Sequence, residues 1–254
     1  MDYFCGVDIG SSTAKLVLVD ASGRIVARCM KRSGVDYGKT AEELRETLCS
    51  QAKIDCAEIR RAISTGYGRD NVRWSDGKMT EIACHGKGAF SVFRKRMTVI
   101  DIGAQDSKVI HLDESGKRTG FRMNRKCAAG TGAFLEEVAH RLALDISELN
   151  TLAEKSTREV TLGSFCTVFA ATEIIEKIRS GAAVEDIVRG AFSSVAKRIV
   201  EMDSVDGMVV ATGGVVAHNP FMAVMLGNAF STKAFIAPDA QYMGAFGAAL
   251  FAMD

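Results

Sequence analysis

The chain has 254 residues, of which 47% are hydrophobic, and it carries 32 basic and 31 acidic side chains. This composition indicates a folded globular protein of one large or two small domains, and it excludes a disordered or fibrous chain. The near-neutral charge, without long runs of one sign, predicts no nucleic-acid partner and no membrane partner. The N-terminus lacks a signal-peptide pattern, and no stretch reaches the ~18 apolar residues of a spanning helix, so we expect a cytoplasmic protein.

The first half begins with a segment that is repeated later in the chain. Residues 8–15 (DIGSSTAK) are echoed by residues 101–108 (DIGAQDSK), an offset of 93 (101 − 8). In each copy an apolar run leads into Asp-x-Gly, a polar turn follows, and a second apolar strand ends at Asp20 or Asp113 before a glycine turn. The chain is therefore predicted to be a duplicated α/β unit.

The elements between and after the two repeats follow from periodicity and capping signals. Thr40 and Glu43 form a capping-box pattern that predicts a helix running to about Lys53. A strand at 58–64 follows, so the first half reads as three strands, a helix, a strand and a helix. The second half is predicted to contain a strand at 208–211 and helices at 134–144, 170–179, 184–202 and 244–253. We assign residues 1–96 and 243–254 to a first subdomain and residues 97–242 to a second.

Both repeats have the residues of a phosphate-binding turn. An Asp at a strand end followed by Gly and hydroxyl residues lets backbone N–H groups surround a phosphate, while the carboxylate holds hydrated Mg²⁺. Either copy alone is equally explained by a plain turn whose glycine adopts a positive φ angle. Two copies in register, with Gly213-Gly214 after a later strand, favour an ATP cleft between two facing halves. The expected phosphate-binding residues are Gly10, Ser11, Ser12, Thr13, Lys15 and Gly103.

Cys127 and Cys166 each stand just before a predicted helix. Neither belongs to a Cys-x-x-Cys pair, so one chain cannot supply the four thiolates of a closed metal or iron–sulfur site. A two-fold axis would bring both cysteines of two copies together at one shared cluster. Each cysteine alone is equally explained as a small buried hydrophobe. The helix stripes expected to face inward are Leu135, Val138, Ala139 and Leu142 after Cys127, and Ile174, Ile175 and Ile178 after Cys166.

The start of the helix after Cys127 is expected to point free N–H groups and the positive end of its dipole at the sulfur. The other cysteines show no framework spacing, which indicates a reducing compartment where thiols stay free or bind metal. We expect His85 to be a satisfied or exposed histidine rather than a ligand. The five cysteines expected to serve only in packing are Cys5, Cys29, Cys49, Cys56 and Cys84.

Four segments carry a resemblance to a known family. Residues 124–136 (NRKCAAGTGAFLE), 166–170 (CTVFA), 65–69 (TGYGR) and 244–249 (GAFGAA) resemble the activators of 2-hydroxyacyl-CoA dehydratases. That family includes the ATPase subunits of benzoyl-CoA reductase, and the resemblance covers essentially the whole chain. It implies the duplicated ribonuclease-H-like nucleotide-binding fold shared by actin, sugar kinases and Hsp70.

The resemblance also implies a function. It implies a homodimer in which Cys127 and Cys166 of both subunits hold one oxygen-sensitive [4Fe–4S] cluster. ATP hydrolysis would be coupled to the transfer of one low-potential electron to an iron–sulfur dehydratase or a related reductase component. A ferredoxin or flavodoxin is the implied electron donor.

Roles for single residues follow from this scheme as hypotheses. Asp8 and Asp101 would orient Mg²⁺ and the attacking water, which Gln105 or Asp106 would position. Glu136 is equally explained as an acidic residue favoured in the first turn of a helix. The residues expected to contact the adenosine part of ATP or ADP are Gly132 and Glu136 at the ribose, Gly213 and Gly214 at the adenosine and its phosphates, and Gln241 at the adenine.

The chain departs from the family pattern at Ala104, Arg125, Ala133 and the pair Ala171-Thr172. Three of these departures flank the expected cluster or partner surface, so a reductase for a different iron–sulfur acceptor is an alternative. A small-molecule kinase of the same fold is a second alternative, although such kinases usually need more chain for a substrate domain. A chaperone-like or filament ATPase is a third, and it leaves the two cysteine settings unexplained.

Overall fold

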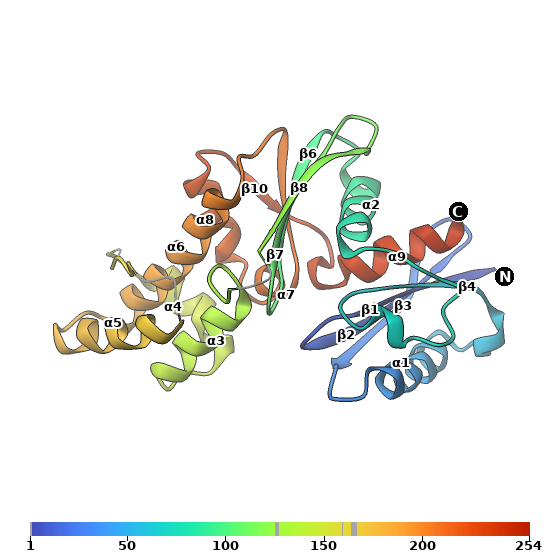
Figure 1. The fold of residues 1–254 in the computed structure, drawn as a ribbon, viewed down its shortest axis with the longest axis horizontal. Helices are drawn as coiled ribbons and strands as arrows, with labels where there is room; N and C mark the ends of the chain where they lie inside the picture. Colours follow the sequence, from blue (N-terminus) through green and yellow to red (C-terminus); the bar gives the residue numbers. More distant parts are fainter. Residues whose placement is uncertain (1, 125–126, 159, 164–166) are drawn as a thin grey trace. The chain divides into compact units, whose positions relative to one another are not determined.

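The computed structural model describes residues 2–124, 127–158, 160–163 and 167–254. Contacts divide the chain into two units (Figure 1). The first comprises Met1–Arg94, Ser115–Arg118 and Gln241–Asp254, and the second comprises Lys95–Glu114 and Thr119–Ala240. Each unit is built around a five-stranded sheet, so the sequence repeat corresponds to a structural repeat.

The first unit has the strand order β3-β2-β1-β4-β5, with β1 antiparallel to β2 and parallel to β4. Side chains alternate along β2, so Leu16 and Leu18 pack with residues of α1 while Val17 and Val19 pack with residues of α9. Both faces of this sheet are therefore buried. The elements are β1 (Tyr3–Ile9), β2 (Thr13–Asp20), β3 (Ile25–Arg32), α1 (Tyr37–Ala52), β4 (Ile59–Thr65), β5 (Gly77–Lys78), α2 (Glu81–Phe93) and α9 (Met243–Met253).

The second unit repeats this arrangement in the order β10-β9-β6-β7-β8, with β6 antiparallel to β7 and parallel to β9. Its core joins the sheet to α3, α5, α6 and α8, with Phe134 and Phe192 among the largest buried side chains. The elements are β6 (Met97–Ile102), β7 (Ser107–Leu112), β8 (Arg118–Asn124), α3 (Gly132–Arg141), α4 (Leu149–Lys155), α5 (Thr167–Arg179), α6 (Val184–Met202), β9 (Met208–Thr212), α7 (Gly214–His218), α8 (Phe221–Ala229) and β10 (Ala234–Ile236).

Most predicted elements are confirmed, and α6 has the predicted bounds. The predicted start of the first helix is wrong. Asp36 caps α1 by accepting from the Lys39 N–H, whereas Thr40 lies inside the helix and donates its hydroxyl to the Ser33 carbonyl at 2.8 Å. A hydroxyl and an acid three residues apart also occur within a helix, so the pattern alone does not locate the cap. The short elements α4, α7, α8 and β10 were not predicted.

The two predicted helix stripes have different outcomes. On α3, Leu135, Val138 and Ala139 are buried and Leu142 packs against the same core, as predicted. On α5, Ile174 is buried, but Ile175 and Ile178 are 51% and 47% exposed, so that part of the prediction is wrong. Three isoleucines over five positions span more of a helix surface than its single buried face, and only Ile174 lies on that face.

The cysteine expectation is wrong for one pair. Cys49 and Cys56 form a disulfide with Cα atoms 5.6 Å apart. The end of α1 and the reversal of the chain after it bring together two cysteines whose spacing gave no framework signal. The packing role is confirmed for Cys5, Cys29 and Cys84, which are buried in the core of the first unit. This burial raises the pKa of Cys29 to about 11 and that of Cys84 to about 12, and it also raises the pKa of Cys5.

Within the described residues, no helix combines the length and the apolar character that crossing a bilayer requires.

Two glycines, Gly6 of β1 and Gly247 of α9, allow α9 to lie against its neighbours with almost no space between backbones. A Cβ on Gly6 of β1 would lie 1.8 Å from the Ala245 carbonyl oxygen, and one on Gly247 would lie 1.8 Å from the Cys84 carbonyl oxygen of α2. Real Cβ atoms never approach a backbone atom so closely, so a side chain at either position would push α9 away.

We therefore expect Gly247→Ala to lower the free energy of unfolding by about 3 kcal/mol, because a methyl group would force α9 and α2 apart. Chemical denaturation of the full chain measures this. Gly120→Ala is the control, since a Cβ there meets only an ordinary contact, 3.6 Å from His111 Cδ2. Equal stability of the two variants would contradict the close-packing argument.

Candidate functional site

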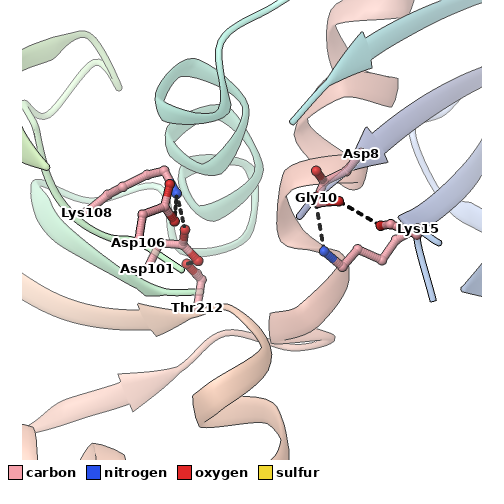
Figure 2. Close-up of polar contacts among 8 residues, drawn as sticks. Asp8, Gly10, Lys15, Asp101, Asp106, Lys108 and Thr212 are labelled. Carbon is pink, nitrogen blue, oxygen red and sulfur yellow. Dashed lines mark hydrogen bonds and ion pairs between the residues drawn. The ribbon is translucent and has the colours of Figure 1, made fainter. Parts of the chain in front are cut away.

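The turn between β1 and β2 carries Asp8 and Lys15 in direct contact. These residues are paired across the antiparallel ladder, and Lys15 Nζ lies 3.3 Å from Asp8 Oδ2 (Figure 2). The Gly10 N–H donates to the Thr13 carbonyl at 3.1 Å and closes the turn. Ser11 and Ser12 at the tip are exposed, so their hydroxyl groups are accessible to a phosphate.

Two glycines from other elements confine the Asp8 carboxylate. Gly66, directly after β4, has a φ of +91°, and a Cβ there would lie 2.6 Å from Asp8 Oδ1 and 2.4 Å from the Ile9 carbonyl oxygen. A Cβ on Gly244 of α9 would lie 3.1 Å from Asp8 Oδ2. Any side chain at these positions would displace the carboxylate. Their backbones therefore fix the direction in which Asp8 presents its oxygens.

The turn between β6 and β7 repeats this arrangement with one additional carboxylate. Lys108 Nζ lies 3.0 Å from Asp101 Oδ2 and 2.7 Å from Asp106 Oδ1, and only 1% of the Lys108 side chain is exposed (Figure 2). The Gly103 N–H donates to the Asp106 carbonyl at 2.9 Å, which closes this turn as Gly10 closes the first. Gln105 at the tip is exposed. Two carboxylates around one cation leave a net negative charge, which suits the binding of a divalent cation.

Thr212 and Gly213 confine Asp101 as Gly66 confines Asp8. The Thr212 hydroxyl donates to Asp101 Oδ1 at 3.3 Å. Gly213 has a φ of +95°, and a Cβ there would lie 2.5 Å from both Asp101 Oδ1 and the Ile102 carbonyl oxygen. The Gly213 N–H donates to the Ala240 carbonyl, next to the half-buried Gln241. Gly214 begins α7 and is half-buried.

Comparison of the two units identifies site residues that the sequence reasoning missed. Thr65 pairs with Asp8 on parallel strands, and Thr212 pairs with Asp101 in the same way. Each threonine is followed by a glycine with positive φ that approaches the Asp carboxylate. The signal in the sequence was a Thr-Gly pair at the end of a strand in each half. The two Thr-Gly pairs are 147 residues apart (212 − 65), whereas the two Asp turns are 93 residues apart. A search for repeats at one fixed separation therefore does not find both.

The start of α3 is bonded to the second turn. The Gly132 N–H donates to the Gly103 carbonyl at 2.9 Å, and the Ala133 N–H donates to the Ala104 carbonyl at 2.8 Å. The expectation that free N–H groups of this helix point at Cys127 is therefore wrong for these two groups. They are satisfied by the turn that carries Asp101. Glu136 is exposed, one turn further along α3.

Cys127 is exposed in a segment whose carbonyl groups are held by two neighbouring side chains. The Asn124 side-chain amide donates to the carbonyls of Cys127 and Ala129, at 3.1 and 2.7 Å. The Ser107 hydroxyl donates to the Gly130 carbonyl, and Gly130 has a φ of +76°. The structure thus fixes the backbone and leaves the thiol accessible. The other expected cluster ligand, Cys166, lies outside the described residues, as does Arg125.

The chain was compared with known protein families and structures. Residues 5–252 match the model of the BadF/BadG/BcrA/BcrD ATPase family. The 2-hydroxyisocaproyl-CoA dehydratase activator of Clostridioides difficile is 39% identical over 99% of this chain and 95% of its own. The crystal structure of component A of (R)-2-hydroxyglutaryl-CoA dehydratase from Acidaminococcus fermentans is 37% identical, with a TM-score of 0.94 over 100% of this chain and 98% of its own.

Two further structures extend these similarities. The activator of 2-hydroxyisocaproyl-CoA dehydratase from Clostridium difficile, determined with bound ADPNP, is 37% identical, with a TM-score of 0.92 over 99% of this chain and 94% of its own. A ROK family glucokinase from Streptomyces griseus has a TM-score of 0.57 at 15% identity, over 98% and 99% of the two chains, which shows a shared fold alone. The predicted fold class, the duplicated nucleotide-binding α/β fold, is confirmed.

The arrangement around Lys108 predicts a large effect of removing its charge. Lys108→Met would leave Asp101 and Asp106 close together without the cation between them. We expect the free energy of unfolding at pH 7 to fall by about 3 kcal/mol, because a buried charge then loses its partner. Lys39→Met is the control. Lys39 is 73% exposed and lies 3.9 Å from Glu43, so its loss is worth ~0.5 kcal/mol or less.

The double variant Lys108→Met/Asp106→Asn separates charge from packing. If repulsion between the two carboxylates causes the loss, this variant recovers part of it in the same denaturation experiment. No recovery would show that the Lys108 side chain matters chiefly through its packing.

Proposed function

Because the chain belongs to the BadF/BadG/BcrA/BcrD ATPase family, we propose that it is an ATP-dependent activator that transfers one electron to an iron–sulfur partner enzyme. By similarity to the activators, the partner is a 2-hydroxyacyl-CoA dehydratase. The observation that carries this proposal is the pair of backbone hydrogen bonds from α3 to the Gly103–Ala104 turn. They connect the turn that carries Asp101 directly to the helix that follows Cys127.

The proposed ATP and Mg²⁺ site uses the two turns. The carboxylates of Asp8 and Asp101 have the hard oxygen donors that Mg²⁺ prefers, and the glycines that confine them hold those oxygens in place. Phosphate oxygens would be bound by Lys15 and by the N–H and hydroxyl groups at the turn tip, because the N–H groups of Gly10 and Gly103 are used inside their turns. The expected tip residues are Ser11, Ser12 and Thr13.

Catalysis at such a site is mainly positioning and charge stabilisation. We assign Gln105 to orient the attacking water, since its side chain is exposed at the tip of the second turn. Asp106 shares Lys108 with Asp101 and keeps the lysine in place, and its own oxygens are the alternative water-positioning group. The residues proposed to bind the adenosine remain Gly132, Glu136, Gly213, Gly214 and Gln241.

Cys127 fits the role of a cluster ligand, because its thiol is exposed while its backbone is held by Asn124. A [4Fe–4S] cluster bound by Cys127 and Cys166 of two subunits would supply a one-electron couple at low potential. One chain offers only these two candidate thiols, so the proposal requires a homodimer. A ferredoxin or flavodoxin would reload the cluster.

The coupling of ATP hydrolysis to electron transfer would run through the second unit. A change of the nucleotide at the Gly103–Gln105 turn alters the carbonyls that accept from α3. That helix begins five residues after Cys127, so the environment of the cysteine changes with the nucleotide. Solvent exposure and hydrogen bonding around a cluster set its potential, and this connection therefore links ATP to electron transfer.

We expect Asp101→Asn and Asp8→Asn each to lower kcat for ATP hydrolysis by about 100-fold or more, since each removes a charge that would hold Mg²⁺. Release of phosphate measures this. Asp20→Asn is the control, because the Asp20 carboxylate accepts from Ser22 and Arg24 within its own turn. This variant should hydrolyse ATP like the parent chain. Full activity of Asp101→Asn would refute the assignment.

The cluster proposal is tested by iron content. Protein purified without oxygen should contain about four iron and four sulfide per dimer. Cys127→Ser and Cys166→Ser should each lose most of both, because each removes two of the four thiolates from the shared site. Cys29→Ser is the control, since Cys29 is buried in the core of the first unit. Absence of iron in the parent chain after anaerobic reconstitution would favour the kinase alternative.

A further inference from the structure

The bonded pair Cys49 and Cys56 lies in the first unit and is not among the residues assigned to ATP or to the cluster. The chain between the two cysteines is fixed by backbone hydrogen bonds. At the end of α1, Lys53 adopts the left-handed conformation that closes a helix, and the Ile54 N–H donates to the Cys49 carbonyl at 3.1 Å. Asp55 and Glu58 then form a reciprocal capping box around Cys56.

These caps turn the chain so that the two cysteines lie near one another. Their Cα separation of 5.6 Å lies in the range that a disulfide requires, so the backbone is already arranged for the bond to form. Cys49 is buried and Cys56 is half-buried, so an incoming thiol or disulfide reaches Cys56 first. Cys56 is therefore the sulfur at which exchange would begin.

One cation connects the pair to the segment that follows β4. Arg45 Nη2 donates to the Cys56 carbonyl at 3.5 Å, and the guanidinium lies 4.9 Å from the centre of the Trp74 ring. Just past Trp74, the Asp76 N–H donates to the Ala62 carbonyl at 2.8 Å. The carbonyl that accepts from Arg45 belongs to one of the two bonded cysteines, so the disulfide restrains the residue on which the contact between Arg45 and Trp74 depends.

The same segment begins at the Asp8 carboxylate. Gly66 confines Asp8, and the Gly68 N–H donates to the Ile9 carbonyl at 2.8 Å. Residues 66–76 thus run from the Asp8 turn to the Arg45–Trp74 contact. This segment is held at one end by the Gly68–Ile9 hydrogen bond and at the other end by the Arg45–Trp74 contact. The second of these contacts is next to the disulfide.

We propose that Cys49 and Cys56 form a reversible thiol–disulfide site, and that oxidation of this pair braces residues 66–76 against α1. The reaction is exchange with a thiol–disulfide couple. Starting from the reduced pair, the Cys56 thiolate attacks one sulfur of the external disulfide. This step forms a mixed disulfide and releases one thiol. The Cys49 thiolate then attacks Cys56 Sγ in the mixed disulfide and releases the second thiol. Two electrons pass from the cysteine pair to the external disulfide. The two protons that the cysteines lose end on the two released thiols.

The test uses the full-length chain without nucleotide in glutathione buffers that span reducing to oxidising ratios. Two readouts follow the pair: alkylation of Cys49 and Cys56 by mass spectrometry, and the fluorescence of Trp74, the one tryptophan in the sequence. We expect the alkylation and the fluorescence to change with the glutathione ratio, and we expect both transitions to have the same midpoint. Hydrogen exchange of residues 66–76 should be about threefold or more faster in the reduced protein.

Three variants provide controls. Cys49→Ser/Cys56→Ser should lose the redox response of the fluorescence, and Trp74→Phe should lose the fluorescence while keeping the alkylation midpoint. Cys29→Ser, which changes a buried cysteine outside the pair, should keep both responses.

Three results would overturn the proposal: alkylation of both cysteines at every buffer ratio, a bond that persists until the protein unfolds, or identical fluorescence and exchange in the two states. The readouts need neither iron nor a partner protein. The proposed electron-transfer function can therefore fail while this proposal stands, and the reverse also holds.

Discussion

The ion pair of Asp101 with the buried Lys108 is the interaction on which the second unit depends. A lysine with 1% of its side chain exposed needs carboxylate partners, and Asp101 and Asp106 supply them from the two sides of one turn. The same lysine thereby sets the position of the carboxylate proposed for Mg²⁺. The carbonyls of this turn accept the first N–H groups of α3, so an electrostatic constraint in the sheet extends to the segment that contains Cys127.

The first unit repeats this design in a less charged form. Asp8 pairs with Lys15, and its carboxylate is confined by the glycines Gly66 and Gly244. This difference suits different tasks. The first turn presents an exposed hydroxyl-rich tip for phosphate, whereas the second combines a net negative charge with a direct backbone connection to a helix. Duplication supplied two similar turns, and the residues around each turn distinguish their proposed roles.

Several features could be predicted because they depend on local sequence. The Asp turns at 8–15 and 101–108 are contiguous, so their repeat is visible without any structure, and the bounds of α6 follow from an uninterrupted helical pattern. The shared place of the two Thr-Gly pairs beside the Asp carboxylates was missed, because these partners are distant in sequence. Only the parallel pairing of β1 with β4, and of β6 with β9, brings each of them to its Asp carboxylate.

The sequence by itself determined the duplicated fold, the two Asp turns and the candidate cysteines, because strand periodicity, turn chemistry and motif spacing act over short stretches of chain. Only the tertiary structure decided that Lys108 bridges two carboxylates, that the first N–H groups of α3 are already bonded, and that Cys49 meets Cys56. These three facts depend on which atoms meet after the chain has turned back on itself. A linear pattern cannot specify such meetings, because burial and hydrogen-bond partners are properties of the packed molecule.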